Sequence, residues 1–287
     1  MKILIGFDGA EHSAPVLDTL KQRIWPRHSQ LKFLTIVKPE KRLWPLKASK
    51  GNQTADRQYA QLESALKTIC SDLQLSHETV EGEAQELIAK EALNWEADMV
   101  IVGCRPEHPN DPLLLGSVSQ NLLDALKCPV LVAKQSHMEK NEHNILVPLE
   151  KSPVSKHVMD WLSKQRYTRA SKIKLVCVLP PMLRSIEEGS LEHRQMLFHQ
   201  YAEMERTHQE FLGECKKTLE HSYASESILC QTFHGEAANC ILDEANAWPA
   251  DLIVMGSHGE MGLQRILSGS ISRSISIHAG CSVEVVK

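Results

Sequence analysis

The residues with the clearest chemical potential form a glycine-rich stretch near the end of the chain, residues 256–270. It follows an apolar run, residues 252–255, that predicts a buried strand, and it leads into a helical pattern. Glycines let a backbone approach a ligand closely, and a helix N-terminus offers free N–H groups to an anion. Strand, glycine turn and helix in this order predict a phosphate-binding loop. Three glycines alone would be weak evidence, since turns need glycine too.

The same stretch occurs twice, which strengthens this interpretation. Moving the C-terminal half back by 153 positions (256 − 103) aligns residues 232–281 with residues 79–128 without a gap, and the starts of the two halves match at a slightly shorter offset. The aligned pairs include Gly82 with Gly235, Glu91 with Glu244, Trp95 with Trp248, Asp98 with Asp251, Gly103 with Gly256, and Gly116-Ser117 with Gly269-Ser270. The sequence therefore predicts two copies of one domain of about 140 residues. We place them at 1–135 and 143–287, joined by a polar linker.

Composition indicates two folded cores and excludes several classes of protein. A chain of 287 residues with 42% hydrophobic residues is sufficient for two cores. The net charge of −4 provides no general attraction to nucleic acid or to anionic membranes. No apolar run approaches the roughly 20 residues that span a bilayer, and the first residues lead directly into a strand. The eight cysteines show no Cys-x-x-Cys spacing, so we expect small core residues in a cytoplasmic protein, without a zinc site.

Strand and helix patterns alternate along both halves. The expected strands are 2–7, 31–37, 77–80, 99–103 and 130–133 in the first half, and 144–149, 172–178, 228–233, 252–256 and 283–286 in the second. The expected helices of the first half are 14–24, 54–73, 82–95 and 115–126. This alternation predicts the α/β class, with a doubly wound, Rossmann-like, five-stranded parallel sheet in each half.

A long polar helix is expected over residues 190–222. It carries His193, His199, His208 and His221, whose spacing is not that of a metal site, so we expect a solvated face. Ligands of doubly wound sheets bind beyond the carboxyl ends of the strands, where the strand order reverses. The acidic residue that ends the first strand and the glycine loop after the fourth strand should meet there.

The C-terminal half is similar to universal stress protein domains, whose nucleotide-binding members carry Gly-x2-Gly-x9-Gly-Ser/Thr after the fourth strand. The sequence reads Gly256-x2-Gly259-x9-Gly269-Ser270, a complete match. The resemblance spans both halves, so the chain resembles a tandem universal stress protein. It implies a stress-response protein that binds ATP, with or without Mg²⁺.

The resemblance also implies a set of binding residues. Those implied for the phosphates are Gly256, Gly259, Gly269 and Ser270, with the N–H of Ile271 at the helix start. Backbone near Val178 is implied for the adenine. At the end of the first strand the family usually has Asp, and this half has Glu150, which is one methylene longer. Two outcomes stay open: the Glu150 carboxylate accepts hydrogen bonds from the ribose, or it points into solvent.

The N-terminal half departs from the family pattern in its loop. Asp8 stands at the expected acidic position, but Pro106 replaces the second glycine. Proline has no N–H to donate and fixes φ near −65°. Glu107 and Asp111 place negative charge where a phosphate would lie, and Arg105 offsets one of them at most. We expect a degenerate copy that is retained for folding and domain pairing.

We therefore expect a nucleotide-binding protein that acts by regulation or interaction and is not an enzyme. A slow ATPase is one alternative, although the chain has no Gly-x4-Gly-Lys-Ser/Thr motif and offers only His258 and Arg265 near the loop as charged groups that could assist hydrolysis. A scaffold that uses neither nucleotide site is another, with helices 54–73 and 190–222 facing an unknown protein partner. The last strands, 130–133 and 283–286, are expected to pair, within one chain or in a homodimer.

Overall fold

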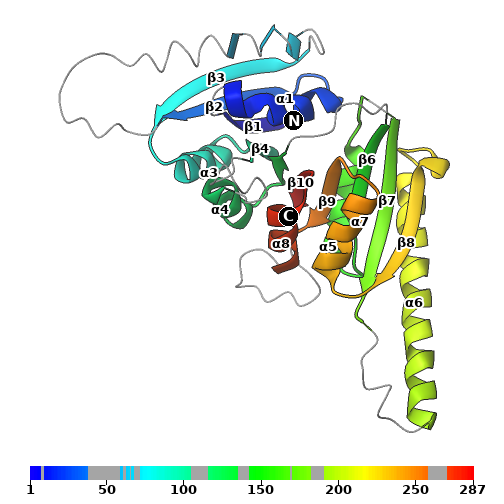
Figure 1. Ribbon diagram of the computed structural model, residues 1–287. Helices are drawn as coiled ribbons and strands as arrows, with labels where there is room; N and C mark the ends of the chain where they lie inside the picture. The colour runs from blue at the N-terminus through cyan, green and yellow to red at the C-terminus, as the bar shows by residue number, and fades with distance from the viewer. Residues whose placement is uncertain are drawn as a thin grey trace, which may run out of the picture. The chain divides into compact units, whose positions relative to one another are not determined.

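The computed structural model describes residues 1–7, 10–37, 59–60, 63–64, 66–67, 72–104, 116–134, 142–168, 170–181, 191–257 and 270–287. The chain forms two compact units (Figure 1). Unit 1 comprises Met1–Ser136 with Arg166–Thr168, and unit 2 comprises His137–Gln165 with Arg169–Lys287. Each unit is an α/β domain built on parallel strands.

Unit 1 orders its described strands β3-β2-β1-β4-β5, all parallel. Its elements are β1 (Lys2–Phe7), α1 (Ala10–Gln22), β2 (Gln30–Val37), β3 (Gln74–Glu81), α3 (Ala84–Asn94), β4 (Met99–Gly103), α4 (Ser117–Ala125) and β5 (Val130–Ala133). The first strand lies in the middle, with the second and third on one side and the fourth and fifth on the other. This order confirms the predicted doubly wound arrangement.

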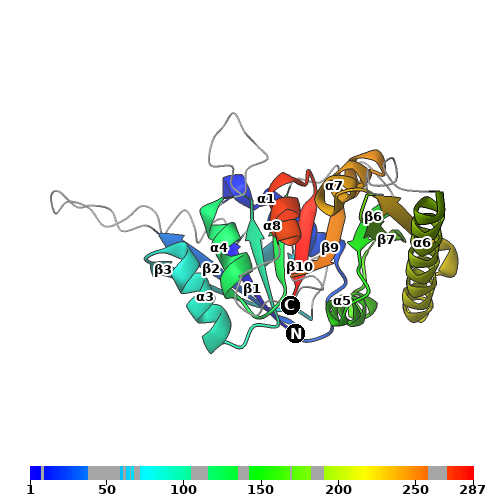
Figure 2. The same cartoon turned by 90° about the horizontal axis from the view of Figure 1, so that it is seen from below.

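Unit 2 repeats the order as β10-β9-β6-β7-β8, again all parallel. Its elements are β6 (Glu142–Pro148), α5 (Pro153–Lys164), β7 (Ala170–Leu179), α6 (Leu191–Leu219), the short 3-10 helix Ser225–Ser227, β8 (Ile228–His234), α7 (Ala237–Ala247), β9 (Leu252–Gly256), α8 (Ser270–His278) and β10 (Ser282–Val286). Helices α5 and α6 pack against each other, and α7 packs against α8 (Figure 2).

The central strands and the edge strand β3 differ in burial. The central strands β1, β4, β6 and β9 are almost wholly buried, as their continuous apolar runs predict. The edge strand β3 alternates exposed and half-buried residues and pairs with β2 along its whole length, from Gln74 to Glu81. It is therefore longer than the expected 77–80, because an edge strand tolerates polar residues on its solvated side.

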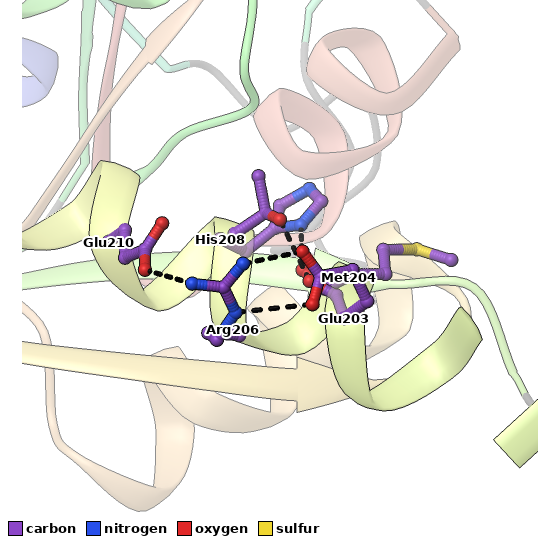
Figure 3. A network of polar contacts seen from close by, with 6 residues as sticks. Glu203, Met204, Arg206, His208 and Glu210 are labelled. Atoms are coloured by element: carbon purple, nitrogen blue, oxygen red, sulfur yellow. Dashed lines mark hydrogen bonds and ion pairs between the residues drawn. The ribbon is translucent and has the colours of Figure 1, made fainter. Parts of the chain in front are cut away.

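Helix α1 differs from the expectation, whereas α6 agrees with it. Helix α1 begins at Ala10, four residues before the expected start, and includes Pro15. Helix α6 runs over 191–219, within the expected 190–222, and extends past the carboxyl ends of β7 and β8 (Figure 1). The exposed surface of its middle turns carries an ionic cluster, in which Arg206 contacts Glu203 and Glu210 of the same helix (Figure 3).

His208 of α6 and His221, just beyond the end of α6, each contact the backbone four residues earlier. The Nδ1 atom of His208 lies 2.7 Å from the carbonyl oxygen of Met204, as Figure 3 shows. Nδ1 of His221 lies 3.2 Å from the carbonyl oxygen of Lys217. His199 and His221 are exposed, as expected for a solvated face, whereas His208 is half-buried.

Several residues of the internal repeat have matching roles in the folding of the two units. Gly82 and Gly235 adopt φ values of +152° and +149°, which favour glycine. A Cβ at Gly82 would lie 2.8 Å from a side-chain carbon of Leu87, and one at Gly235 would lie 2.7 Å from the Cys240 sulfur. The turn into the following helix therefore requires glycine in both units.

The repeated aspartates fix the start of the first strand. The Asp98 carboxylate accepts the backbone N–H of Lys2 at 2.7 Å. In unit 2 the Asp251 carboxylate accepts the backbone N–H of Asn144 at 2.9 Å. Each aspartate lies just before the fourth strand, so this bond aligns the first and fourth strands at their amino ends.

A lysine of the second strand forms an ion pair with the repeated glutamate in both units. In unit 1, Lys32 Nζ lies 2.7 Å from carboxylate oxygens of both Glu91 and Glu78. Burial lowers the pKa of Lys32, but these two carboxylates outweigh it and raise the pKa above its usual value. In unit 2, Lys174 contacts Glu244, and both side chains are 11% exposed.

Removing the Glu244 charge should destabilise unit 2 more than the matching change destabilises unit 1. Glu244→Gln leaves the buried Lys174 ammonium without its carboxylate, which should cost about 2–3 kcal/mol of unfolding free energy. Glu91→Gln leaves Lys32 with Glu78, so a loss of about 1 kcal/mol is expected. Urea unfolding followed by circular dichroism measures both. Equal losses in the two variants would contradict this account.

Candidate functional site

The predicted site residues of unit 2 lie at the carboxyl edge of its sheet. Strand β6 pairs with β7 on one side and with β9 on the other, so the strand order reverses between β6 and β9. Glu150 follows the end of β6, Val178 is the penultimate residue of β7, and Gly256 ends β9. The structure therefore brings Glu150, Val178 and Gly256 to one edge, at the position where doubly wound sheets bind ligands.

Glu150 is held by the start of α5. Its carboxylate accepts the Ser152 hydroxyl at 3.0 Å, and its backbone N–H donates to the Ser155 hydroxyl at 3.0 Å. The residue is half-buried, and the charge of Glu150 contributes to the raised pKa of Cys177 in β7. The carboxylate is thus oriented beside β7 by protein contacts.

Packing requires a glycine at position 256, whether or not a ligand binds there. A Cβ at this position would lie 2.3 Å from Cγ1 of Val154 and 3.6 Å from Cγ2 of Val158. Real side chains never approach so closely, so α5 can lie against the end of β9 only where there is no side chain. The first glycine of the motif therefore has a structural role.

The start of α8 is tied to the end of β9. The Ser272 hydroxyl donates to the carbonyl of Ser257 at 3.2 Å, and the Ser257 N–H donates to the carbonyl of Val286 at 2.9 Å. Ser270 is the first residue of α8 and is exposed, and Ile271 is 42% exposed. The first N–H groups of a helix have no partner within it, so Ser270 and Ile271 offer donors here.

Several predicted residues cannot be placed at this edge. Gly259 and Gly269, and with them His258 and Arg265, lie outside the described residues. The same is true of the N-terminal residues Asp8, Arg105, Pro106, Glu107 and Asp111. Their roles remain predictions from the sequence.

Unit 1 has similar hydrogen bonds at the end of its fourth strand, but a different residue follows the glycine that ends the strand. The Ser119 hydroxyl donates to the carbonyl of Gly103 at 3.2 Å. Cys104 takes the place of Ser257, and its N–H donates to the carbonyl of Ala133 at 2.9 Å. Burial raises the pKa of the Cys104 thiol, while the charge of Lys134 and a backbone hydrogen bond oppose the rise.

Sequence reasoning missed one polar cluster at the same edge of unit 2. The rings of Tyr201 in α6 and His234 at the end of β8 stack, with centroids 5.5 Å apart. The Glu205 carboxylate lies 3.6 Å from Nε2 of His234 and accepts the Thr232 hydroxyl at 3.4 Å. His234 lies beside Leu179, one residue beyond Val178. The spacing of Tyr201 and Glu205, four residues apart on one helix face, is the signal that could have indicated the cluster.

No group of three or more His, Cys, Asp or Glu side chains is arranged to hold a metal ion in the described part of the chain. Over the same residues, no helix has both the length and the apolar character that crossing a membrane requires.

Known proteins show similarity to both halves of the chain. The sequence pattern of the Universal stress protein family matches residues 1–134 and 142–287. A universal stress protein of Methanocaldococcus jannaschii is 33% identical over 170 residues, which cover 58% of this chain and 94% of that protein. A universal stress protein of Mycolicibacterium smegmatis is 24% identical over 301 residues, covering 99% of this chain and 96% of the relative.

Solved structures share the fold at low sequence identity. A functionally unknown protein of Pseudomonas aeruginosa matches with a TM-score of 0.65 and 15% identity, covering 100% of this chain and 92% of that one. A universal stress protein of Archaeoglobus fulgidus matches with a TM-score of 0.58 and 18% identity, covering 100% and 96%. With the family match over nearly the whole sequence, these findings show that the chain belongs to the universal stress protein family and carries two of its domains in tandem.

Proposed function

We propose that unit 2 binds ATP or a related nucleotide at the carboxyl edge of its sheet. The observation that carries the proposal is the meeting of Glu150, Val178, Gly256 and the start of α8 at the point where the strand order reverses. The complete Gly-x2-Gly-x9-Gly-Ser spacing supports it, because that loop joins β9 to α8.

Each of these residues would contact a different part of the nucleotide. The N–H groups at the start of α8 and the Ser270 hydroxyl suit phosphate oxygens, with or without Mg²⁺. Ribose hydroxyls would donate to Glu150, whose carboxylate is already oriented by Ser152. The adenine would lie against backbone near Val178. A site held in its bound conformation loses little conformational freedom on binding, which favours affinity.

The proposed role is binding with regulation, without dedicated turnover. Hydrolysis needs a positioned base or water and a group that stabilises the developing charge. Of the family-implied residues that the structure describes, Glu150 alone is titratable, and Ser152 engages it. Nucleotide binding to the folded state stabilises that state by mass action, which is a sufficient basis for a signal.

An interaction role is the second candidate function. The first turns of α6 carry three exposed apolar side chains, Leu191, Met196 and Phe198, with exposed fractions of 77%, 56% and 52%. Exposed apolar side chains gathered on one element favour a protein partner. This function becomes the leading one if unit 2 binds no nucleotide.

Calorimetric titration of the full chain with Mg-ATP tests the proposed function. We expect saturable binding of one ATP per chain. Gly259→Pro, which copies Pro106 of the first half, should abolish it by removing an N–H donor and fixing φ. Absence of binding up to millimolar ATP would reject the proposal and favour the interaction role.

The Ser270 hydroxyl at the start of α8 should contribute to ATP affinity, whereas the matching Ser117 hydroxyl of unit 1 should not. Ser270→Ala is expected to weaken ATP binding about tenfold, because a hydrogen bond to a charged phosphate is worth about 1.5–3 kcal/mol. Ser117→Ala changes the matching residue of unit 1 and should leave the affinity unchanged. The same calorimetric titration measures both. Equal effects, or a larger effect of Ser117→Ala, would place the nucleotide elsewhere.

The Glu150 carboxylate should govern recognition of the ribose. Glu150→Ala is expected to weaken ATP binding about tenfold by removing a charged acceptor. Glu150→Asp, which restores the usual family residue, should bind ATP at least as tightly as the natural chain. Competition with 2′-deoxy-ATP tests the contact itself, since the natural chain should discriminate against it and Glu150→Ala should not. Unchanged affinity in Glu150→Ala would show that the carboxylate does not contact the nucleotide.

A further inference from the structure

We propose that Cys215 and Cys230 of unit 2 are a redox-sensitive pair that forms a disulfide when a peroxide oxidises the protein, joining α6 to β8. The two cysteines are 15 positions apart (230 − 215) and do not form a Cys-x-x-Cys motif. The folded structure brings them together, on the face of the sheet that α6 covers.

The strand register places two cysteines on one face of the sheet. In the parallel pair of β7 and β8, Cys177 lies opposite Thr232, and Cys230 lies opposite Leu175. Side chains alternate between faces along a strand, so residues two apart point to the same side. Cys177 and Cys230 therefore project to the same face, on neighbouring strands.

Helix α6 brings the third thiol to this face. Leu212 and Cys215 are three residues apart on α6 and are both buried, at 1% and 7% exposure. The Cys230 thiol donates to the carbonyl of Leu212, with a sulfur–oxygen distance of 3.6 Å. The Cys230 sulfur thus touches the helical turn that carries Cys215.

The environments of the three thiols indicate which one reacts first. Burial raises the pKa of Cys177 to about 12 and that of Cys215 to about 11, so both stay protonated near neutral pH. Burial also raises the pKa of Cys230, and Glu220 adds to the rise while the Lys216 ammonium opposes it. Cys230 is the exposed member of the three. An oxidant in solution reaches an exposed thiol before a buried one, so Cys230 reacts first.

The chemistry balances with hydrogen peroxide as the oxidant. The Cys230 thiolate attacks one peroxide oxygen, the O–O bond breaks, and the products are a sulfenic acid and, after protonation, one water. The Cys215 thiol then attacks the Cys230 sulfur, forming the S–S bond and releasing a second water. The two thiols lose two electrons and two protons in total, and the peroxide is reduced to two waters.

Peptide mass spectrometry of the peroxide-treated full chain tests the proposal directly. Folded protein is oxidised, remaining thiols are alkylated, and the protein is digested without reductant. We expect one cross-linked pair of peptides that contains Cys215 and Cys230, about 2 Da lighter than the sum of the two reduced peptides. A cross-link through Cys177, or no cross-link at a peroxide dose that oxidises the urea-unfolded chain, would overturn the proposal.

Cysteine variants separate the two roles. In Cys230→Ser, the remaining Cys215 thiol should stay reduced under peroxide. In Cys215→Ala, oxidation should stop at a Cys230 sulfenic acid, which dimedone traps. Cys240→Ser, which changes a half-buried thiol in α7 beside the carboxyl end of β8, is the matched control and should form the cross-link at the natural rate. Circular dichroism checks that each variant is folded. Dimedone labelling of Cys215 in the Cys230→Ser protein would reverse the assigned order.

The rate of cross-linking should also increase with pH. The pKa of Cys230 lies above its usual value, so its thiolate fraction rises as the pH increases from 7 to 9. Cross-linking should therefore accelerate over this interval, and Lys216→Ala should slow it at every pH because the opposing positive charge is lost. A rate that is independent of pH and of Lys216 would show that Cys230 is not the attacking thiol.

Discussion

Each unit depends on a lysine that its second strand places beneath a helix. Lys32 and Lys174 are largely buried, and a buried ammonium is tolerated only beside a carboxylate. Glu91 and Glu244 supply that carboxylate from α3 and α7, and Lys174 also lies 4.8 Å from the centre of the Trp248 ring. The helix held in this way leads directly into the fourth strand. The ion pair therefore helps to determine where that strand, and the glycine that ends it, can lie.

Such structural requirements explain why several positions of the internal repeat are the same in both units. Several of the repeated positions form a contact that folding requires: the glycines open a turn, the glutamates neutralise the lysines, and Asp98 and Asp251 align two strands. The repeat is thus strong evidence for two copies of one fold and weaker evidence for two binding sites. Evidence about function lies where the copies differ, above all at Gly259 against Pro106.

The sequence predicted the α/β class, the strand positions and the edge of the sheet where Glu150, Val178 and Gly256 meet, because apolar runs and strand order determine these features. It did not predict that Val154 requires a glycine at 256, or that Ser152 orients Glu150. Nor did spacing indicate the thiol cluster. Such contacts depend on how each helix rests on the sheet, and neither periodicity nor motif spacing specifies that packing.

The first turn of α5 supports both sides of the candidate site at once. Val154 packs where Gly256 has no side chain, while Ser152 and Ser155 bind the carboxylate and the N–H of Glu150. A change at either end of the site is therefore transmitted to α5. For this reason a loss of affinity on altering Gly256 would not by itself identify a phosphate contact, since the same change displaces Val154 and with it the residues that orient Glu150. Ser270, whose described position is exposed at a helix start, reports on the ligand more directly than the glycine that first drew attention to the motif.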